Sequence, residues 1–130
     1  MQKNRYPLGE VHNLGIVQIM ASTEIGADAT VGTNNNSAAG AWVKPGATTG
    51  VYRWTSADKI GGKASQCIAV PVFRAGTIVN LQVSIKAKSI NASSFLVVDV
   101  VLEASGVATD PVAACGVDMI LWVKDSGVTP

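Results

Sequence analysis

The residue types that most often carry catalysis are sparse in this chain. His12 is the only histidine among the 130 residues. A zinc site with histidine ligands, or a serine, histidine and aspartate triad, would therefore depend on a single imidazole. That imidazole follows Pro7 and Gly9 in a polar stretch where we expect no regular structure to hold it. We predict neither a catalytic nor a metal-binding role for His12.

Carboxylates offer a second kind of chemistry. Glycoside hydrolysis needs two carboxylates about 5 to 10 Å apart, and calcium needs several oxygen ligands together. The candidates are Asp99, Glu103, Asp110 and Asp118. Their spacing matches no calcium-loop motif, and carboxylates on solvent-facing strand positions are more often solvated or paired with lysine. We expect no catalytic pair and no metal site among them.

Glycine-rich segments could bind phosphate, but the spacing here is unsuitable. Gly61-Gly62-Lys63 lacks the length and the following serine or threonine of a P-loop, and residues 26–40 contain no dinucleotide-binding fingerprint. We interpret these glycines as turns. The sequence therefore predicts a protein that is not an enzyme and that uses no cofactor.

Large aromatic side chains are the remaining candidates for ligand binding. Trp42, Tyr52, Trp54 and Trp122 could stack on sugar rings if they were exposed. Aromatics of this size also supply much of the buried area in cores and subunit interfaces. We favour core or interface positions for most of them and keep glycan stacking as the alternative. Solvent exposure distinguishes the two.

The charge of the chain argues against two classes of partner. The net charge is +1, and lysine and arginine are scattered without a basic run, so neither nucleic acid nor a membrane surface is an expected partner. No segment approaches the roughly 20 apolar residues of a membrane span. Met1 is followed by no apolar stretch typical of a secretion signal, and we expect no secretion.

Charged residues make up 15% of the chain, against about 25% in ordinary soluble domains. Interface cores are depleted in charge. The deficit therefore indicates surface that is buried against other chains.

The clearest structural pattern is the alternation in residues 77–88. Odd positions from Val79 to Ala87 are apolar, and even positions from Asn80 to Lys88 are polar. Successive side chains of a strand point to opposite faces, so this segment predicts a strand with one face on a core. Residues 94–104 predict a second strand whose core face carries the even positions.

These two segments predict an antiparallel hairpin whose register is restricted, because opposed residues must share a face. Ile85 lies opposite either Val98 or Val100. The second register also places Lys86 beside Asp99, an opposite-charge pair, and we favour it for that reason.

Shorter runs predict strands at residues 14–22, 29–31, 41–43, 51–56, 66–73 and 117–124. The first of these is apolar enough to be buried on both faces. Tyr52 and Trp54 share one face of their strand, and Pro71 places its strand at an edge or a bulge. Residues 117–124 direct odd positions to the core, so Ile120 and Trp122 face outward as a candidate contact surface.

No window carries the periodicity of a helix. We therefore predict one all-β domain, an antiparallel two-sheet β-sandwich over residues 14–130, preceded by an extended N-terminal arm over residues 1–13. Its length allows a core without metals or disulfides. We expect Cys67 and Cys115 to be buried free thiols, with a disulfide between them as the alternative.

Residues 73–106 resemble the central hairpin of jelly rolls such as carbohydrate-binding modules and phage virion proteins. The shared features are the turn at Ala75-Gly76, a strand ending in Lys86-Ala87-Lys88, a short polar loop and a second alternating strand. The arm, the low charge and the many small residues make the chain more similar to a phage capsid decoration, or cement, protein. This resemblance implies an antiparallel jelly-roll-like β-sandwich and a non-enzymatic virion protein on the capsid surface, made in the cytoplasm of a host.

The same resemblance implies that the chain binds the major capsid protein or other virion subunits as a homo-oligomer, with a trimer favoured. The alternatives are a carbohydrate-binding or receptor-binding jelly-roll module, and a small tail or fibre subunit. The predicted contact residues are Arg5, Tyr6, Pro7, Leu8, Trp42, Trp54, Ile120 and Trp122.

Overall fold

The computed structural model describes residues 16–60, 67–74 and 81–124. The predicted arm, with its proposed contact residues Arg5, Tyr6, Pro7 and Leu8, lies outside the described residues. The described chain is all-β, as predicted. Its strands are β1 (Ile16–Ile25), β2 (Val31–Asn35), β3 (Gly40–Val43), β4 (Val51–Lys59), β5 (Cys67–Arg74), β6 (Gln82–Ile90), β7 (Phe95–Ala104), β8 (Val107–Ala108) and β9 (Cys115–Lys124).

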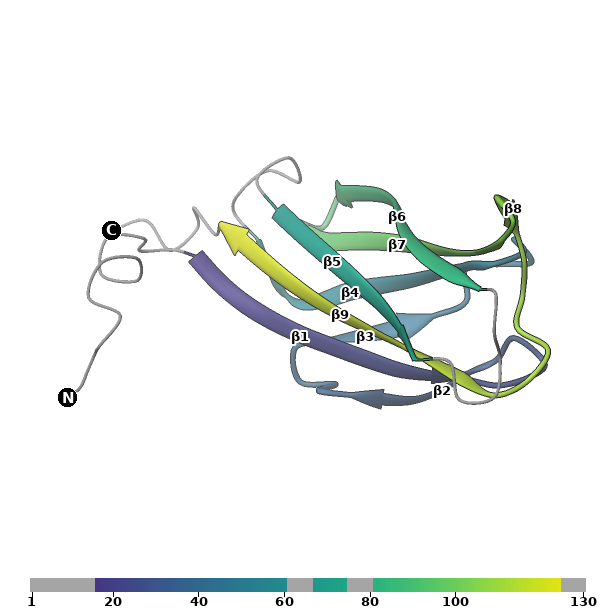
Figure 1. The fold of residues 1–130 in the computed structure, drawn as a ribbon. Coiled ribbons are helices and arrows are strands. Elements are labelled where there is room, and N and C mark those ends of the chain that lie inside the picture. The colour runs from purple at the N-terminus through teal and green to yellow at the C-terminus, as the bar shows by residue number, and fades with distance from the viewer. Residues whose placement is uncertain (1–15, 61–66, 75–80, 125–130) are drawn as a thin grey trace, which may run out of the picture.

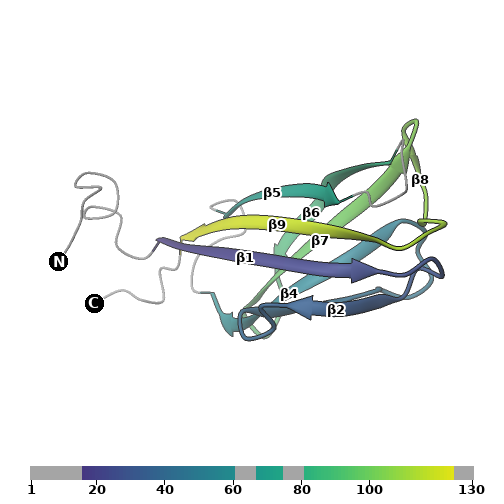
Figure 2. The ribbon, with the colours of Figure 1, turned by 60° about the horizontal axis from the view of Figure 1, so that its bottom comes forward.

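Two antiparallel sheets face each other as a β-sandwich (Figures 1 and 2). Sheet A has the order β2-β1-β9-β5. Sheet B has the order β3-β4-β7-β6, and the short β8 pairs with β7. β5 lies at an edge of sheet A, which confirms the position predicted from Pro71, because proline cannot donate a hydrogen bond to a second neighbour.

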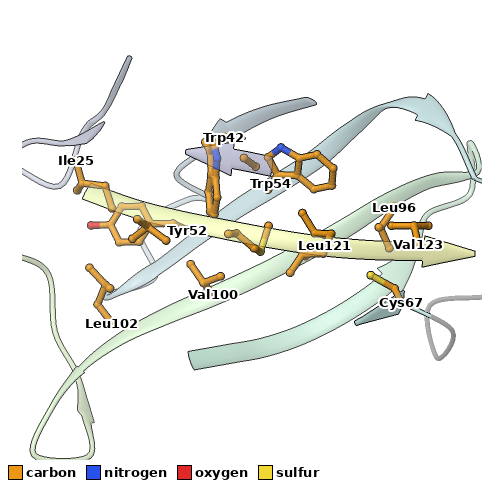
Figure 3. Packing of buried hydrophobic residues seen from close by; sticks show 14 of the residues in the cluster. Ile25, Trp42, Tyr52, Trp54, Cys67, Leu96, Val100, Leu102, Leu121 and Val123 are labelled. Atoms are coloured by element: carbon orange, nitrogen blue, oxygen red, sulfur yellow. The ribbon is translucent and has the colours of Figure 1, made fainter. Parts of the chain in front are cut away.

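The core lies between the sheets and is built from alternate strand positions (Figure 3). Sheet B contributes Tyr52, Trp54, Leu96, Val98, Val100 and Leu102, all fully buried. Sheet A contributes Val117, Met119, Leu121 and Val123 from β9. These inward faces are the ones that the alternation predicts. Burial of each large apolar side chain stabilises the fold by about 1.5 to 3 kcal/mol.

The β6–β7 hairpin begins in the predicted register and then departs from it. Ile85 lies opposite Val100, as expected, but a bulge between Ile85 and Ala87 then places Ala87 opposite Asp99. The extra residue of a bulge reverses the faces that follow it. Lys88 is therefore half-buried rather than on the outer face, and its ammonium group donates to the Cys67 carbonyl oxygen.

The predicted pairing of Lys86 with Asp99 is wrong. Asp99 instead accepts two hydrogen bonds from Arg53 directly opposite it on β4, with Nε–Oδ1 and Nη2–Oδ2 distances of 2.7 and 3.0 Å. A planar guanidinium can bind both carboxylate oxygens at once, and an ammonium displaced by a bulge cannot. This pair raises the pKa of the Arg53 guanidinium.

The early strands differ from their predicted limits and exposure. Ala29, expected in a strand, has a φ of +66° and belongs to the turn that Gly26 N closes on the Thr30 carbonyl. The first strand is not buried on both faces, because Val17 is 44% exposed and Met20 is 57% exposed.

Cys67 and Cys115 are buried free thiols. Cys67 pairs with Val123, while Cys115 lies at the other end of β9 and pairs with Ile25. Eight residues of strand separate these two rows, or about 26 Å. A disulfide requires Cα atoms within about 7 Å, so the alternative of an intrachain disulfide is wrong.

Candidate functional site

The four candidate carboxylates are dispersed over the sandwich. Asp99 and Glu103 lie on β7 in sheet B, whereas Asp118 lies on β9 in sheet A. Asp110 lies between β8 and β9. Within the three described ranges, no group of three or more histidine, cysteine or acidic residues is arranged to hold a metal ion.

Asp110 connects two loops. Its Oδ1 accepts hydrogen bonds from Gly50 N at 2.7 Å, the Tyr52 hydroxyl at 3.0 Å and Lys44 Nζ at 3.1 Å. Lys44 Nζ also lies 4.5 Å from the centroid of the Tyr52 ring. Burial raises the pKa of Asp110, but these hydrogen bonds outweigh burial and hold it below its usual value. The cluster is satisfied internally and fastens the β3–β4 loop to the segment that leads into β9.

This cluster makes stability depend on pH. Because the folded-state pKa of Asp110 is depressed, its contribution is present above the unfolded-state pKa and is lost as the pH falls through the folded-state pKa. We expect Asp110→Asn to lower the unfolding free energy at pH 7 by about 1 to 2 kcal/mol, allowing for partial exposure.

Urea unfolding at pH 7 and at pH 3 measures this effect. The difference between Asp110→Asn and the wild type should shrink at pH 3, below the ordinary aspartate pKa of about 3.9, because the unfolded state then binds a proton that the folded state disfavours. Asp58→Asn, at an exposed carboxylate, is the control and should change stability little at either pH. A difference for Asp110→Asn that stays constant with pH would contradict the assignment.

Three of the four large aromatics lie inside the sandwich. Trp42 is 2% exposed, and Tyr52 and Trp54 are fully buried (Figure 3). Trp42 and Trp54, predicted as contact residues, offer no surface to a partner because their rings fill the space between the sheets. Trp122 is 37% exposed. The sheets therefore present no row of these aromatics on which a sugar could stack.

Trp122 and Ile120 point to the outer face of sheet A, as the alternation predicts, and apolar side chains flank Ile120 on both sides, whereas Trp122 has Gln18 on its β1 side. In the sheet register, Ile68 lies beside Trp122, and Val70 and Met20 lie on either side of Ile120. We call this surface the sheet-A face. Its members are Ile16, Met20, Ile68, Val70, Val72, Ile120 and Trp122.

The exposure of the sheet-A face is high for aliphatic side chains. Ile68 is 61% exposed, Val72 is 52% exposed and Val70 is 43% exposed. A contiguous apolar surface of this kind marks an interaction site more often than single exposed residues do. The contribution of β5 was missed from the sequence, although its outward and inward positions are both apolar, which is unusual for an edge strand with one solvated face.

The sheet-A face ends at a cluster of ion pairs. Arg74 Nε bonds Asp118 Oδ2 at 2.8 Å, and Arg74 Nη1 lies 3.0 Å from Glu24 Oε2. The guanidinium lies over Gly116, where a Cβ atom would come within 2.5 Å of Arg74 Cζ. Hydrogen bonds and charge interactions with both carboxylates raise the pKa of Arg74. The charges at this boundary are thus paired with one another.

The outer face of sheet B differs in character. The paired side chains of Arg53 and Asp99 occupy its centre, and exposed Ser84 and Gln82 lie along β6. Val43 is 50% exposed there and lies opposite Arg53, and the nearby Val51 and Val101 are buried. The two sides of the sandwich are therefore chemically unlike, and sheet A carries the apolar one.

No family model, curated protein or solved structure matches this chain. Among the described elements there is no helix that is long and apolar enough to cross a membrane.

Proposed function

We propose that this chain is a non-enzymatic structural subunit of a virus particle. In this proposal it is a decoration protein that binds the capsid surface as a homo-oligomer and buries its sheet-A face against a neighbouring virion subunit. The observation that carries the proposal is the sheet-A face itself, in which Ile68, Val70 and Met20 flank Ile120 and Trp122. The resemblance of residues 73–106 to jelly-roll virion proteins is the reason for proposing that the assembly is a virus particle.

The chemistry of the face favours a protein partner. Its centre carries no charge, the charges of Arg74, Glu24 and Asp118 at one end are paired, and at the other end Lys124 lies opposite Ile16 at the rim of the face. A second apolar surface can therefore cover it without stranding an unpaired charge, which would be costly. Burial of such a surface is the usual driving force of protein association.

The size of the face favours attachment through many copies. The sheet-A face covers three strands about 4.8 Å apart and five residues of about 3.3 Å along each strand. Its projected area is therefore roughly 230 Å². A stable single interface buries about 800 Å² on each partner. One contact of this kind is weak, but repeated contacts across an oligomer on a lattice raise the effective concentration of the second and third.

The chain crosses between the two sheets four times and also forms same-sheet hairpins β1–β2, β3–β4 and β6–β7, so the jelly-roll part of the proposal rests on the resemblance of residues 73–106. The chain passes from β2 in sheet A to β3 in sheet B, from β4 to β5, from β5 to β6, and back to sheet A at β9. Repeated crossing between two antiparallel sheets is typical of Greek-key sandwiches.

The oligomer constrains where the face packs. If the face packs on the same face of a second copy, the contact has two-fold symmetry. In a cyclic trimer, each face must instead pack on a different surface of the neighbouring copy. The trimer therefore predicts that the sheet-A face packs on a different surface of the neighbour or on the capsid.

The proposal is tested by finding the chain in particles. Particles from the source that encodes it are purified on a density gradient and analysed by mass spectrometry, and light scattering gives the mass of the purified chain. We expect the chain in the particle fraction at a fixed ratio to the shell subunit. Its absence from intact particles would overturn the proposal, and a strictly monomeric mass at all concentrations would remove the homo-oligomer.

A further inference from the structure

The first half of β1 has an unpaired edge within the described part of the chain. β9 pairs with β1 along its whole length, from Ile16 to Ile25. β2 pairs with β1 only from Ser22 onward, and Figure 2 shows β1 extending past β2 toward its N-terminal end. Exposed strand edges are templates for pairing with another extended segment.

One hydrogen bond shows which backbone groups point to this edge. Asn36 Nδ2 donates to the Met20 carbonyl oxygen at 2.8 Å, from the β2 side. Along an antiparallel strand, successive residues direct their N–H and C=O groups to opposite sides. The backbone groups of Ile16 and Gln18, and the Met20 N–H, therefore point to the open edge, while those of Val17 and Ile19 point to β9.

A groove of about 260 Å³ lies against this edge, between the two sheets. Its lining combines apolar Val17, Ile19, Ala39 and Ile60 with polar Gln18, Asn36, Ser56 and Asp58. Val17 shares the inward face of β1 with the buried Ala21, yet 44% of its surface is exposed. The groove is smaller than the roughly 300 to 1,000 Å³ typical of pockets for drug-sized ligands, so side chains from an added strand suit it better than a small molecule does.

We propose that residues 1–13 of the same chain close this edge. In this arrangement an extended part of the segment pairs with β1 between Ile16 and Met20 as a further strand of sheet A, and its apolar side chains enter the groove. Strand addition of this kind uses backbone hydrogen bonds for affinity and alternate side chains for fit.

The length and the position of the segment support its own chain as the occupant. β1 begins at Ile16, next to the groove residues Val17 and Gln18, so a turn before Ile16 is enough to reverse the chain, and Asn13 and Gly15 are turn-forming residue types. The open edge spans about 16 Å, and thirteen residues reach about 43 Å when extended. Tyr6 and Leu8 supply apolar side chains, and Pro7 is tolerated because the new strand would itself be an edge.

Amide hydrogen exchange on the full chain tests the proposal. We expect the Gln18 and Met20 amides to be slow, and to exchange at least about tenfold faster in a chain that lacks residues 1–13. The Val17 and Ile19 amides point to β9 and should stay slow in both proteins, which controls for loss of the fold. Equally fast exchange of Gln18 and Met20 in both proteins would overturn the proposal.

A substitution in the groove tests the same contact without deletion. Ala39→Glu places a bulky second carboxylate, besides Asp58, among the groove residues, and it should speed exchange at Gln18 in the full chain. Ala41→Glu, on the exposed face of β3, is the matched control and should leave it slow. Equal exchange in the two variants would contradict insertion into the groove.

The measurement also identifies the occupant. Protection that persists when the protein is diluted until its mass is that of a monomer supports pairing within one chain. Protection that is lost on dilution along with a higher mass would overturn that assignment in favour of a second copy. The sheet-A face is a different surface, so failure of this proposal leaves the proposed function unaffected.

Discussion

Val70→Lys should reduce incorporation of the chain into particles at least about thirtyfold. Val70 lies on the edge strand β5, in the middle row of the sheet-A face beside Ile120, and is 43% exposed in the single chain. A buried ammonium without a partner costs about 2 kcal/mol even when the flexible side chain carries its charge toward water, and each 1.4 kcal/mol changes an equilibrium tenfold. Particles made in the presence of both variant and wild type, with the incorporated ratio measured by mass spectrometry, give the result.

Val43→Lys is the matched control. Val43 is the same residue type, also on a strand, and is 50% exposed on the outer face of sheet B. We expect its incorporation to equal that of the wild type, and both variants to unfold within about 0.5 kcal/mol of it, as is usual for surface positions. Equal incorporation of Val70→Lys and Val43→Lys would show that the sheet-A face is not the contact.

Gly40→Ala should be the most destabilising of the small substitutions. Gly40 is buried on β3, and a Cβ atom there would lie 2.5 Å from both the Thr55 carbonyl oxygen and the Trp54 ring. Neither group can move easily, because the first is strand backbone and the second fills the core. Overpacking of this kind costs typically 1 to 3 kcal/mol, and we expect about 3 here, seen in urea as a midpoint lower by roughly 1 to 2 M.

Gly32→Ala separates the clash from the general effect of replacing a strand glycine. A Cβ atom at Gly32 would meet Glu24 at 3.5 Å, which is an ordinary contact. Alanine also restricts the unfolded chain. We expect stability to stay within about 0.5 kcal/mol of the wild type or to rise slightly. Destabilisation of both variants by the same amount would contradict the role assigned to Trp54.

Much of the fold was predictable because one face of each long strand contacts the core. The even positions of β7 and the odd positions of β9 are apolar in sequence and buried in the structure. A shift of one residue would have exposed the whole set, so the pattern determines which face is buried. The same reasoning placed Ile85 opposite Val100.

The errors arose where a neighbour outside the local pattern decides the outcome. The bulge after Ile85 leaves no mark in the alternation of β6, so Lys88 was assigned to the wrong face. Asp99 found its partner on β4, a strand 40 or more residues earlier in the chain, and not on the adjacent hairpin strand. Both depend on contacts between segments that sequence periodicity does not describe.

The candidate site was predictable only in part. Ile120 and Trp122 were placed outward from the alternation of β9 alone. Their neighbours Met20, Ile68 and Val70 come from strands on either side, and only the strand order of sheet A brings them together. Trp42 and Trp54 were expected at a contact surface, but aromatic residue type does not distinguish a core position from an exposed one.

The two buried thiols can report the local opening of the sandwich, each at a different end. Burial raises the pKa of both Cys67 and Cys115, so a labelling reagent reacts with either only after local opening. Cys67 lies at the end where β1 begins, and Cys115 lies at the opposite end. In the wild-type chain, the labelling rates of Cys67 and Cys115 should therefore measure how often each end opens, without an added probe.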